Sequence, residues 1–180
     1  VGFVSNYNLI ITGVNTFINN FFSSLAAGIG NLIVMEKKEK QLQFLEMLNF
    51  IGFWIYGFIA VGFYFLLTPV VQALWGSELA LPRNVVVLLV ISQYLTGMRI
   101  PLGTFKTSAG IYEQDRFVPL IQAAVNLVIS IVAVIYLGLP GIFLGTIASS
   151  VLVASWNRAY VVYKYAFQMS AKRYFIKYAI

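Results

Sequence analysis

The chain has 180 residues, of which 60% are hydrophobic and only 10% are charged. Soluble domains carry about a quarter charged residues, so these proportions exclude an ordinary soluble domain and indicate a membrane protein. The sequence has neither Cys nor His, which excludes disulfides, thiolate or imidazole metal ligands and a histidine base. The formal net charge of +6 would suit nucleic acid, but the cations adjoin apolar stretches, where anionic lipid headgroups lie, so we expect no nucleic-acid partner.

Five apolar stretches are long enough to cross a membrane, which takes about 20 residues at about 1.5 Å per residue. Hydrocarbon offers no partner to unpaired backbone groups, and the stretches do not alternate as barrel strands do, so each is expected to be a helix. The sequence therefore predicts an all-α polytopic membrane protein with a bundle of about five transmembrane helices within residues 1–163. The predicted helices are residues 7–35, 42–67, 83–105, 117–137 and 141–163.

The first predicted helix is unusually polar for a membrane span. Asn8, Thr12, Asn15 and Asn19 follow three- and four-residue steps, and Ser23 continues the stripe that they form. Such a stripe is expected to face protein or water rather than lipid. It either lines a hydrophilic transport cavity or makes hydrogen bonds between packed helices, worth about 0.6 kcal/mol per contact.

The third predicted helix carries a charge inside the membrane. Arg99 precedes Lys106 by seven residues, which places the two cations on nearly one face, and Pro101 between them is expected to bend the helix. A guanidinium at that depth either contacts an anion such as a diphosphate or reaches the inner headgroups by snorkelling. Gln93, deeper on the same helix, is a candidate to hydrogen-bond a sugar.

The fourth and fifth predicted helices form a tight hairpin through the Gly-Leu-Pro-Gly turn at residues 138–141. The fourth helix carries a polar line at four-residue spacing, a candidate to join the same cavity, which consists of Gln122, Asn126 and Ser130. The fifth helix carries small residues at the same spacing, Gly141, Gly145 and Ser149. Small residues let helix backbones approach closely, so we interpret this second pattern as helix packing.

The cations orient the predicted helices. Of the twelve Lys and Arg residues, ten fall in alternate polar breaks at residues 36–41, 106–116 and 158–177, the last of which begins at Arg158. Cytoplasmic loops are enriched in Lys and Arg, so these breaks are expected inside, with residue 1 outside and residue 180 cytoplasmic. On the outer side Arg83 is the only cation, and Arg99 is the one cation predicted inside a span. Residues 164–180 mix aromatic residues with cations and predict either an amphipathic tail on the inner surface, leading to a missing segment, or a solvated linker.

The carboxylates form no catalytic constellation. All six lie in or beside the polar breaks, with Glu46 at a border and none in mid-membrane. The sequence shows no acid–base pair, no nucleophile with its base and no glycine-rich phosphate loop beside a strand. We therefore expect no enzyme activity, no metal and no cofactor. Because the chain starts at Val1 and stops where apolar residues resume, we also expect it to be a piece of a longer protein.

Short motifs along nearly the whole chain resemble those of the bacterial polysaccharide flippases. Their order and spacing carry the resemblance more than any single motif does. The motifs are VGFVSNY at residues 1–7, SLAAGIGN at 24–31, Trp54, residues 69–76, FKTSAG at 105–110, DRF at 115–117, NLVIS at 126–130 and GLPGIFLGTIAS at 138–149.

This resemblance implies membership of the multidrug, oligosaccharidyl-lipid and polysaccharide exporter superfamily, in which two six-helix lobes surround a central cavity. The fragment resembles helices eight to twelve, within the C-terminal lobe of a transporter of 12 to 14 helices. Such a protein is expected in the bacterial cytoplasmic membrane, where it flips undecaprenyl-diphosphate-linked oligosaccharide outward by alternating access, for O-antigen lipopolysaccharide or capsule. The implied partners are the lipid-linked oligosaccharide, membrane lipids, the missing N-terminal lobe and the polysaccharide polymerase machinery.

The resemblance also implies roles for the polar residues of the spans. Arg99 is the first candidate for contact with the diphosphate, Lys106 is its partner at the inner mouth, and the candidates for the sugar hydroxyls are Asn15, Asn19, Gln93 and Asn126. Three alternatives stay open. A drug or cation antiporter of the same superfamily would need a mid-membrane carboxylate, a glycan polymerase or ligase would need large outer loops, and a structural scaffold would leave glycan export unaffected when lost.

Overall fold

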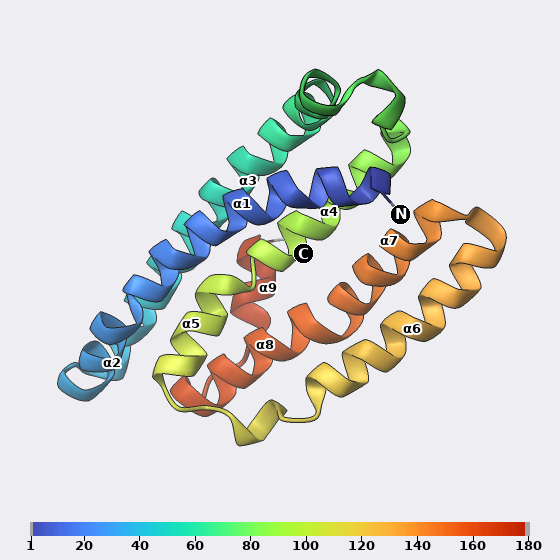
Figure 1. Ribbon diagram of the computed structural model, residues 1–180. Coiled ribbons are helices and arrows are strands. Elements are labelled where there is room, and N and C mark those ends of the chain that lie inside the picture. The colour runs from blue at the N-terminus through green and yellow to red at the C-terminus, as the bar shows by residue number, and fades with distance from the viewer. Residues whose placement is uncertain (1, 179–180) are drawn as a thin grey trace.

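The computed structural model describes residues 2–178, and every regular element within that range is a helix (Figure 1). Five helical segments are long and apolar enough to cross a membrane, Phe3–Met35, Lys38–Trp75, Arg83–Ser108, Glu113–Leu137 and Leu139–Ala166. The prediction of an all-helical chain with five spans is confirmed, and these helices indicate a multi-pass membrane protein. The predicted places of residues 1 and 180 lie outside the described residues, as do the side chains of Arg173 and Lys177.

The five spans differ in the number of helices that form them. The first consists of α1 (Gly2–Ser24) and α2 (Ala26–Met35), the second of α3 (Lys38–Trp75), the third of α4 (Arg83–Gly97) and α5 (Ile100–Ser108), and the fourth of α6 (Val118–Leu137). The fifth joins α7 (Leu139–Ser149), the π-helix η3 (Ser150–Ser155), α8 (Trp156–Val161) and the π-helix η4 (Val162–Ala166). The connections contain the short 3₁₀ helices η1 (Ser77–Leu79) and η2 (Glu113–Asp115), and α9 (Lys172–Tyr178) follows the fifth span.

Side-chain hydrogen bonds shape the first span and the turn after it. The span is interrupted at Leu25, next to Ser24, whose hydroxyl donates to the carbonyl of Phe21 at 2.7 Å. The turn between α2 and α3 is held by Gln41, whose amide donates to the carbonyls of Ile33 at 3.0 Å and Glu36 at 2.8 Å. Carbonyls at a helix end lack a partner within the helix, so the buried Gln41 amide caps α2.

Helix α3 extends further at its C-terminal end than the sequence pattern predicts. The predicted helix ends at residue 67, whereas α3 continues through Pro69 to Trp75. Packed neighbours make a proline tolerable inside a membrane helix, and Val71 beyond it is fully buried. Gly76, with φ of +96°, then ends the helix in a conformation that favours glycine. The outer connection is therefore shorter than the predicted break.

The third span is broken in its inner half, as the position of Pro101 predicts. Helix α4 ends at Gly97 and α5 begins at Ile100. Proline has no N–H to donate to the carbonyl of Gly97 and stands in the first turn of α5, where it is favoured. On the opposite helix, α3 leaves room for this break with Gly52, where an added Cβ would lie 2.7 Å from the Pro101 ring.

Helices α6 and α7 form the predicted hairpin. Gly138 makes the turn with φ of +65°, and Pro140 stands in the first turn of α7. Gly145 is buried against α6, where an added Cβ would lie 2.8 Å from the backbone nitrogen of Ser130. The packing interpretation of the small residues is thus confirmed. No residue of α6 is buried, and α6 lies at the edge of the molecule against α7 (Figure 1).

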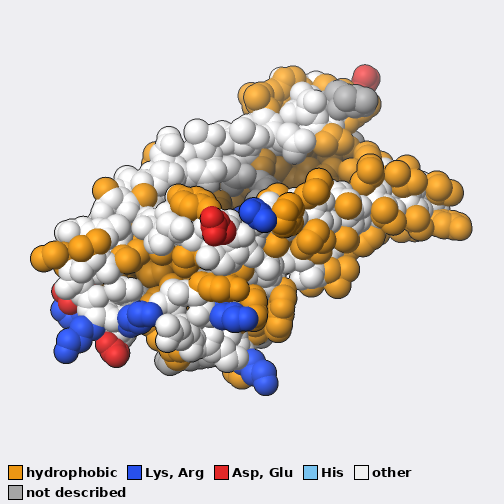
Figure 2. Space-filling view, turned by 90° about the horizontal axis from the view of Figure 1, so that it is seen from below, with side chains coloured by type: hydrophobic (Ala, Val, Ile, Leu, Met, Phe, Trp, Pro, Cys, Tyr) orange, Lys and Arg blue, Asp and Glu red, His pale blue; other side chains and the backbone are white. Residues whose placement is uncertain are grey.

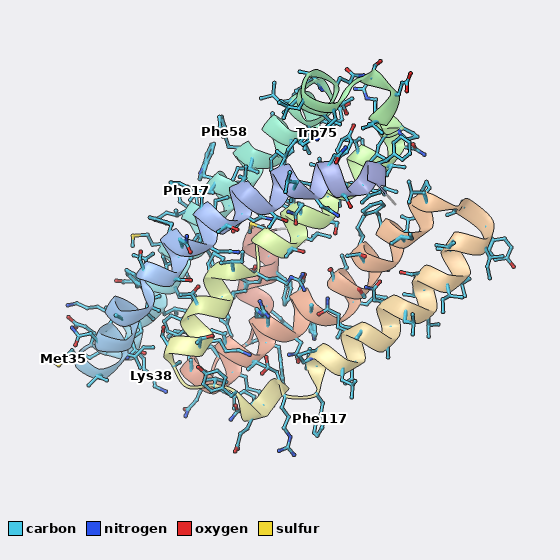
Figure 3. The ribbon with its side chains drawn as sticks, in the orientation of Figure 1. Phe17, Met35, Lys38, Phe58, Trp75 and Phe117 are labelled. Carbon is cyan, nitrogen blue, oxygen red and sulfur yellow. The ribbon has the colours of Figure 1, made fainter. Side chains whose placement is uncertain are left out.

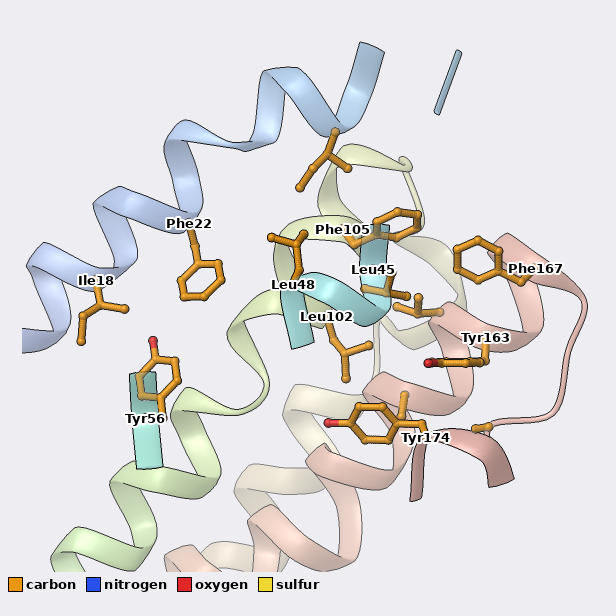
Figure 4. Close-up of a cluster of buried hydrophobic side chains, with 14 residues drawn as sticks. Ile18, Phe22, Leu45, Leu48, Tyr56, Leu102, Phe105, Tyr163, Phe167 and Tyr174 are labelled. Carbon is orange, nitrogen blue, oxygen red and sulfur yellow. The ribbon is translucent and has the colours of Figure 1, made fainter. Parts of the chain in front are cut away.

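Two buried hydrophobic clusters hold the other spans together. The outer core cluster joins α1, α3 and α4 and consists of Tyr7, Ile11, Phe63, Leu67, Val71, Leu81, Val85, Val86, Leu89 and Val90. The inner core cluster adds α5, α8 and the tail and consists of Ile18, Phe22, Ile29, Leu45, Leu48, Tyr56, Leu102, Phe105, Ala159, Val162, Tyr163, Phe167, Ala171 and Tyr174 (Figure 4). The tail therefore packs its Tyr174 ring into the bundle, in α9.

The remaining apolar side chains cover the outside of the bundle. Phe17 of α1 and Phe58 of α3 are 78% and 80% exposed and point away from the other helices (Figure 3). Seen from below, most Lys and Arg side chains in view gather toward one end of the molecule, and hydrophobic side chains cover much of the remaining surface (Figure 2). An apolar girdle with charges gathered at one end is the arrangement expected for a lipid-embedded bundle.

Candidate functional site

Arg158, which begins the third cation-rich break and also falls within the predicted helix 141–163, is helical in the structure. It belongs to α8, within the helical segment Leu139–Ala166, and its Nη1 donates to the backbone carbonyl of Arg99 at 3.4 Å. The side chain runs beside Gly103 of α5, where an added Cβ would lie 3.2 Å from Nη1. Arg158 stands near the end of the apolar stretch, where the predicted helix and the predicted break overlap. Its carbonyl acceptor becomes visible only in the folded bundle.

Arg99 is buried at the break of the third span and is 8% exposed. Its Nε donates to the carbonyl of Leu95 at 3.2 Å, and its Nη2 donates to the hydroxyls of Thr96 at 3.1 Å and Ser150 at 3.5 Å. The first bond occupies a carbonyl in the last turn of α4, where the helix dipole also favours a cation. The last bond reaches η3, so Arg99 links the break in the third span to the π-helix of the fifth.

Lys106 does not pair with the Arg99 region directly but with an acid. Its Nζ lies 2.6 Å from Oδ2 of Asp115 in η2, and both side chains are largely buried, at 13% and 11% exposed. Asp115 is also close enough to Arg158 for its negative charge to act on that guanidinium. Lys106 and Arg158 thus share the carboxylate of Asp115, and Arg158 also contacts the backbone of Arg99.

A cavity of about 310 Å³ opens beside this group. Arg158 supplies its charged lining group, and hydroxyl side chains from two other elements face it as well. The lining residues are Ser23, Ala26, Ile100, Gly103, Thr104, Thr107 and Arg158. The guanidinium can hold an anion in a forked geometry, and the hydroxyls of Ser23 and Thr107 can donate further hydrogen bonds. The hydroxyl of Thr104 already donates to the carbonyl of Ile100 at 3.1 Å and can still accept, so the cavity is suited to an anionic, hydroxyl-bearing ligand.

The polar stripe of α1 borders three cavities in succession. At the outer end Asn8 lines a largely apolar cavity of about 680 Å³, between the start of α1, residues 80–82 and the start of α7. In the middle Asn15 lines a void of about 10 Å³. At the inner end Ser23 lines the cavity that contains Arg158. Three residues of the stripe therefore border cavities that are separate from one another, and only the last of these cavities contains a cation.

The predicted sugar-binding residues fall into separate places. Asn15 and Gln93 are brought together, because both line the small central void. Asn19 is exposed on α1. Asn126 lies away from the cations in the α6–α7 hairpin, where its Oδ1 accepts a hydrogen bond from the hydroxyl of Ser130 at 3.0 Å. This bond joins two of the three residues of the predicted polar line within α6.

Comparison of the chain with protein-family models, with curated proteins and with solved structures finds no match. Within residues 2–178 the side chains also form no group of three or more metal-ligating residues. The chemistry of the site rests on Arg158 and the hydroxyl groups of the cavity beside it.

Proposed function

We propose that this chain is part of the C-terminal lobe of a transporter that flips a diphosphate-linked oligosaccharide lipid across the bacterial cytoplasmic membrane by alternating access. The observation that carries the proposal is Arg158, a guanidinium inside the fifth span that faces a cavity lined with hydroxyl groups. The motif resemblance to polysaccharide flippases supports the same function.

The cavity supplies what such a substrate requires. Sugars and a diphosphate need water or replacement hydrogen-bond donors, because each unpaired polar group in hydrocarbon costs several kcal/mol. Arg158 offers a forked donor to phosphate oxygens, and Thr104 and Thr107 offer hydroxyls beside it. The volume of about 310 Å³ is at the lower end of small-molecule sites, which suits a diphosphate with its first sugar rather than a whole repeat unit.

The structure changes the assignment of roles within this proposal. Arg99 is the weaker candidate for contact with the diphosphate, because it lines none of the cavities described above and its Nε and Nη2 already bind Leu95, Thr96 and Ser150. Arg158 takes that role, and Arg99 fixes the break against which Arg158 rests. Lys106 with Asp115 stands at the inner mouth, where the ion pair can exchange its carboxylate for a phosphate.

The test uses the full-length protein in cells whose surface polysaccharide depends on it. We expect Arg158→Gln to abolish export and to leave lipid-linked glycan on the inner leaflet, with Arg158→Lys retaining part of the activity because it keeps the charge but not the fork. The matched control is Arg116→Gln, which removes an exposed cation that lies over the ring of Phe117. Surface glycan, inner-leaflet precursor and protein level are measured together.

Two outcomes decide the proposal. Export unchanged in Arg158→Gln rejects it. If that variant is absent from the membrane, Thr104→Val and Thr107→Val probe the same cavity without removing a charge, and undiminished export in both also rejects the assignment.

A further inference from the structure

The void in the middle of the bundle is lined by polar and apolar side chains from three helices. Asn15 of α1, Tyr56 of α3, and Gln93 and Tyr94 of α4 line it, together with Ile59, Ala60, Phe63 and Val90. Its volume is about 10 Å³. None of these four polar side chains makes a hydrogen bond to another group in the part of the chain that the structure describes.

Tyr56 is the buried member of this set and cannot move away from the void. It is 3% exposed, and its hydroxyl has no hydrogen-bonding partner among the described protein groups. Its ring stacks on Phe22 with centroids 6.4 Å apart and rests against Gly97, where an added Cβ would lie 2.5 Å from the ring carbon Cγ. Figure 4 shows the hydroxyl pointing towards α1. The packing therefore fixes this hydroxyl at the border of the void.

The size and chemistry of the void select its ligand. A space of about 10–15 Å³ admits one water molecule, and buried waters typically make about three hydrogen bonds to polar groups that lack other partners. The lining residues carry no charge, so a bare cation there would have no carboxylate to offset its desolvation. We propose that the void is a binding site for one water molecule, which bridges the Tyr56 hydroxyl to the amides of Asn15 and Gln93.

This site assigns a structural role to Asn15, in the central part of the polar stripe, and that role does not depend on the transported substrate. Asn15 reaches α3 and α4 through the shared water, so the first three spans are tied together at a depth where the membrane offers no other hydrogen-bond partner. If the transport role proposed for Arg158 is wrong, the water site is unaffected. Loss of the water site is measured as a change in thermal stability and not as a change in transport.

The sign of one stability change tests the proposal. In the purified full-length protein, Tyr56→Phe is expected to lower Tm by about 2–4 °C, because the water loses a partner. If the hydroxyl had no bound water, its removal would leave Tm unchanged or raise it, and this result would overturn the proposal. The matched control is Tyr136→Phe, which removes the hydroxyl of a side chain that is 81% exposed on α6 and should not change Tm.

A second measurement separates a shared water from two independent effects. Gln93→Leu is expected to lower Tm, and the double variant with Tyr56→Phe is expected to lose less than the two separate losses combined, because both act on one water. Additive losses contradict a shared ligand. If Tyr56→Phe does not fold, Asn15→Leu paired with Gln93→Leu gives the same comparison. Stabilisation by NaCl over choline chloride that disappears in Tyr56→Phe would assign the site to sodium and overturn the assignment of water.

Discussion

The contact between α6 and α7 leaves no room for a single added methyl group at Gly141. An ideal Cβ at that position would lie 2.5 Å from the carbonyl oxygen of Ala133 and 2.5 Å from the backbone nitrogen of Val134, whereas ordinary contacts begin near 3.4 Å. The obstructing atoms belong to the backbone of α6, so no side chain can rotate out of the way. Gly141→Ala therefore forces the two helices apart by close to 1 Å.

Overpacking of this kind costs about 1–3 kcal/mol. Alanine also gains about 0.8–1.0 kcal/mol in helix propensity over glycine, so the variant must be compared with another Gly→Ala change in a span. Gly62 of α3 is the matched control, because an added Cβ there meets nothing within 4 Å. The difference between the two variants isolates the packing cost, and Gly141→Ala is expected to melt about 2–12 °C below Gly62→Ala.

The assay is thermal unfolding of the full-length protein in detergent, followed by tryptophan fluorescence. Equal melting temperatures for Gly141→Ala and Gly62→Ala would refute the reasoning, because they would show that α6 can move away from α7 without cost. A Gly62→Ala variant that itself melts lower than the parent would show that the comparison lacks a neutral reference.

Three further predictions concern other parts of the chain. Arg99→Gln is expected to destabilise the protein by about 1–3 kcal/mol in the same assay, because the carbonyl of Leu95 loses its donor; an unchanged Tm contradicts this role. Asn49→Leu is expected to raise Tm, because neither amide atom of this buried residue has a partner among the described residues, and a lower Tm would show that the amide is needed. In a background without other cysteines, Ser77→Cys is expected to react with a membrane-impermeant maleimide in intact cells, whereas Gln114→Cys reacts only after lysis; the reverse pattern overturns the predicted orientation.

The number and type of the spans could be predicted because both follow from local properties. Length and hydropathy alone identify a helix that crosses hydrocarbon, and the Gly-Leu-Pro-Gly turn and Pro101 act through the backbone of their own residues. The extent of α3 could not be predicted in this way. Its last turns depend on the burial of Val71 against α1 and α4, which outweighs the break that Pro69 suggests.

In the candidate site, too, some features could be predicted from the sequence and others could not. The polar stripe and the presence of a cation in the third span are visible in the sequence, because both are departures from an apolar pattern. The Arg158 cavity is not visible in the sequence, because it depends on α5 and α8 lying side by side. The pairing of Lys106 with Asp115 does not follow from helix periodicity either. A residue near the end of an apolar stretch can belong to a loop or to a span, and hydropathy does not distinguish the two.

The break in the third span supplies an acceptor for one of the two arginines in the interior of the bundle. Interrupting the helix at Met98 frees the carbonyl of Leu95, because the N–H of Arg99 bonds Thr96 instead, and the Nε of Arg99 donates to that carbonyl. Arg158 donates to the carbonyl of Arg99, which also accepts the backbone N–H of Gly103 at 2.9 Å. A membrane cation needs such acceptors to offset its desolvation. The helix break and the burial of Arg99 are therefore one feature. The position of Arg158 within the fifth helix leaves the charge argument for the predicted orientation intact, because it adds no cation to the predicted outer side.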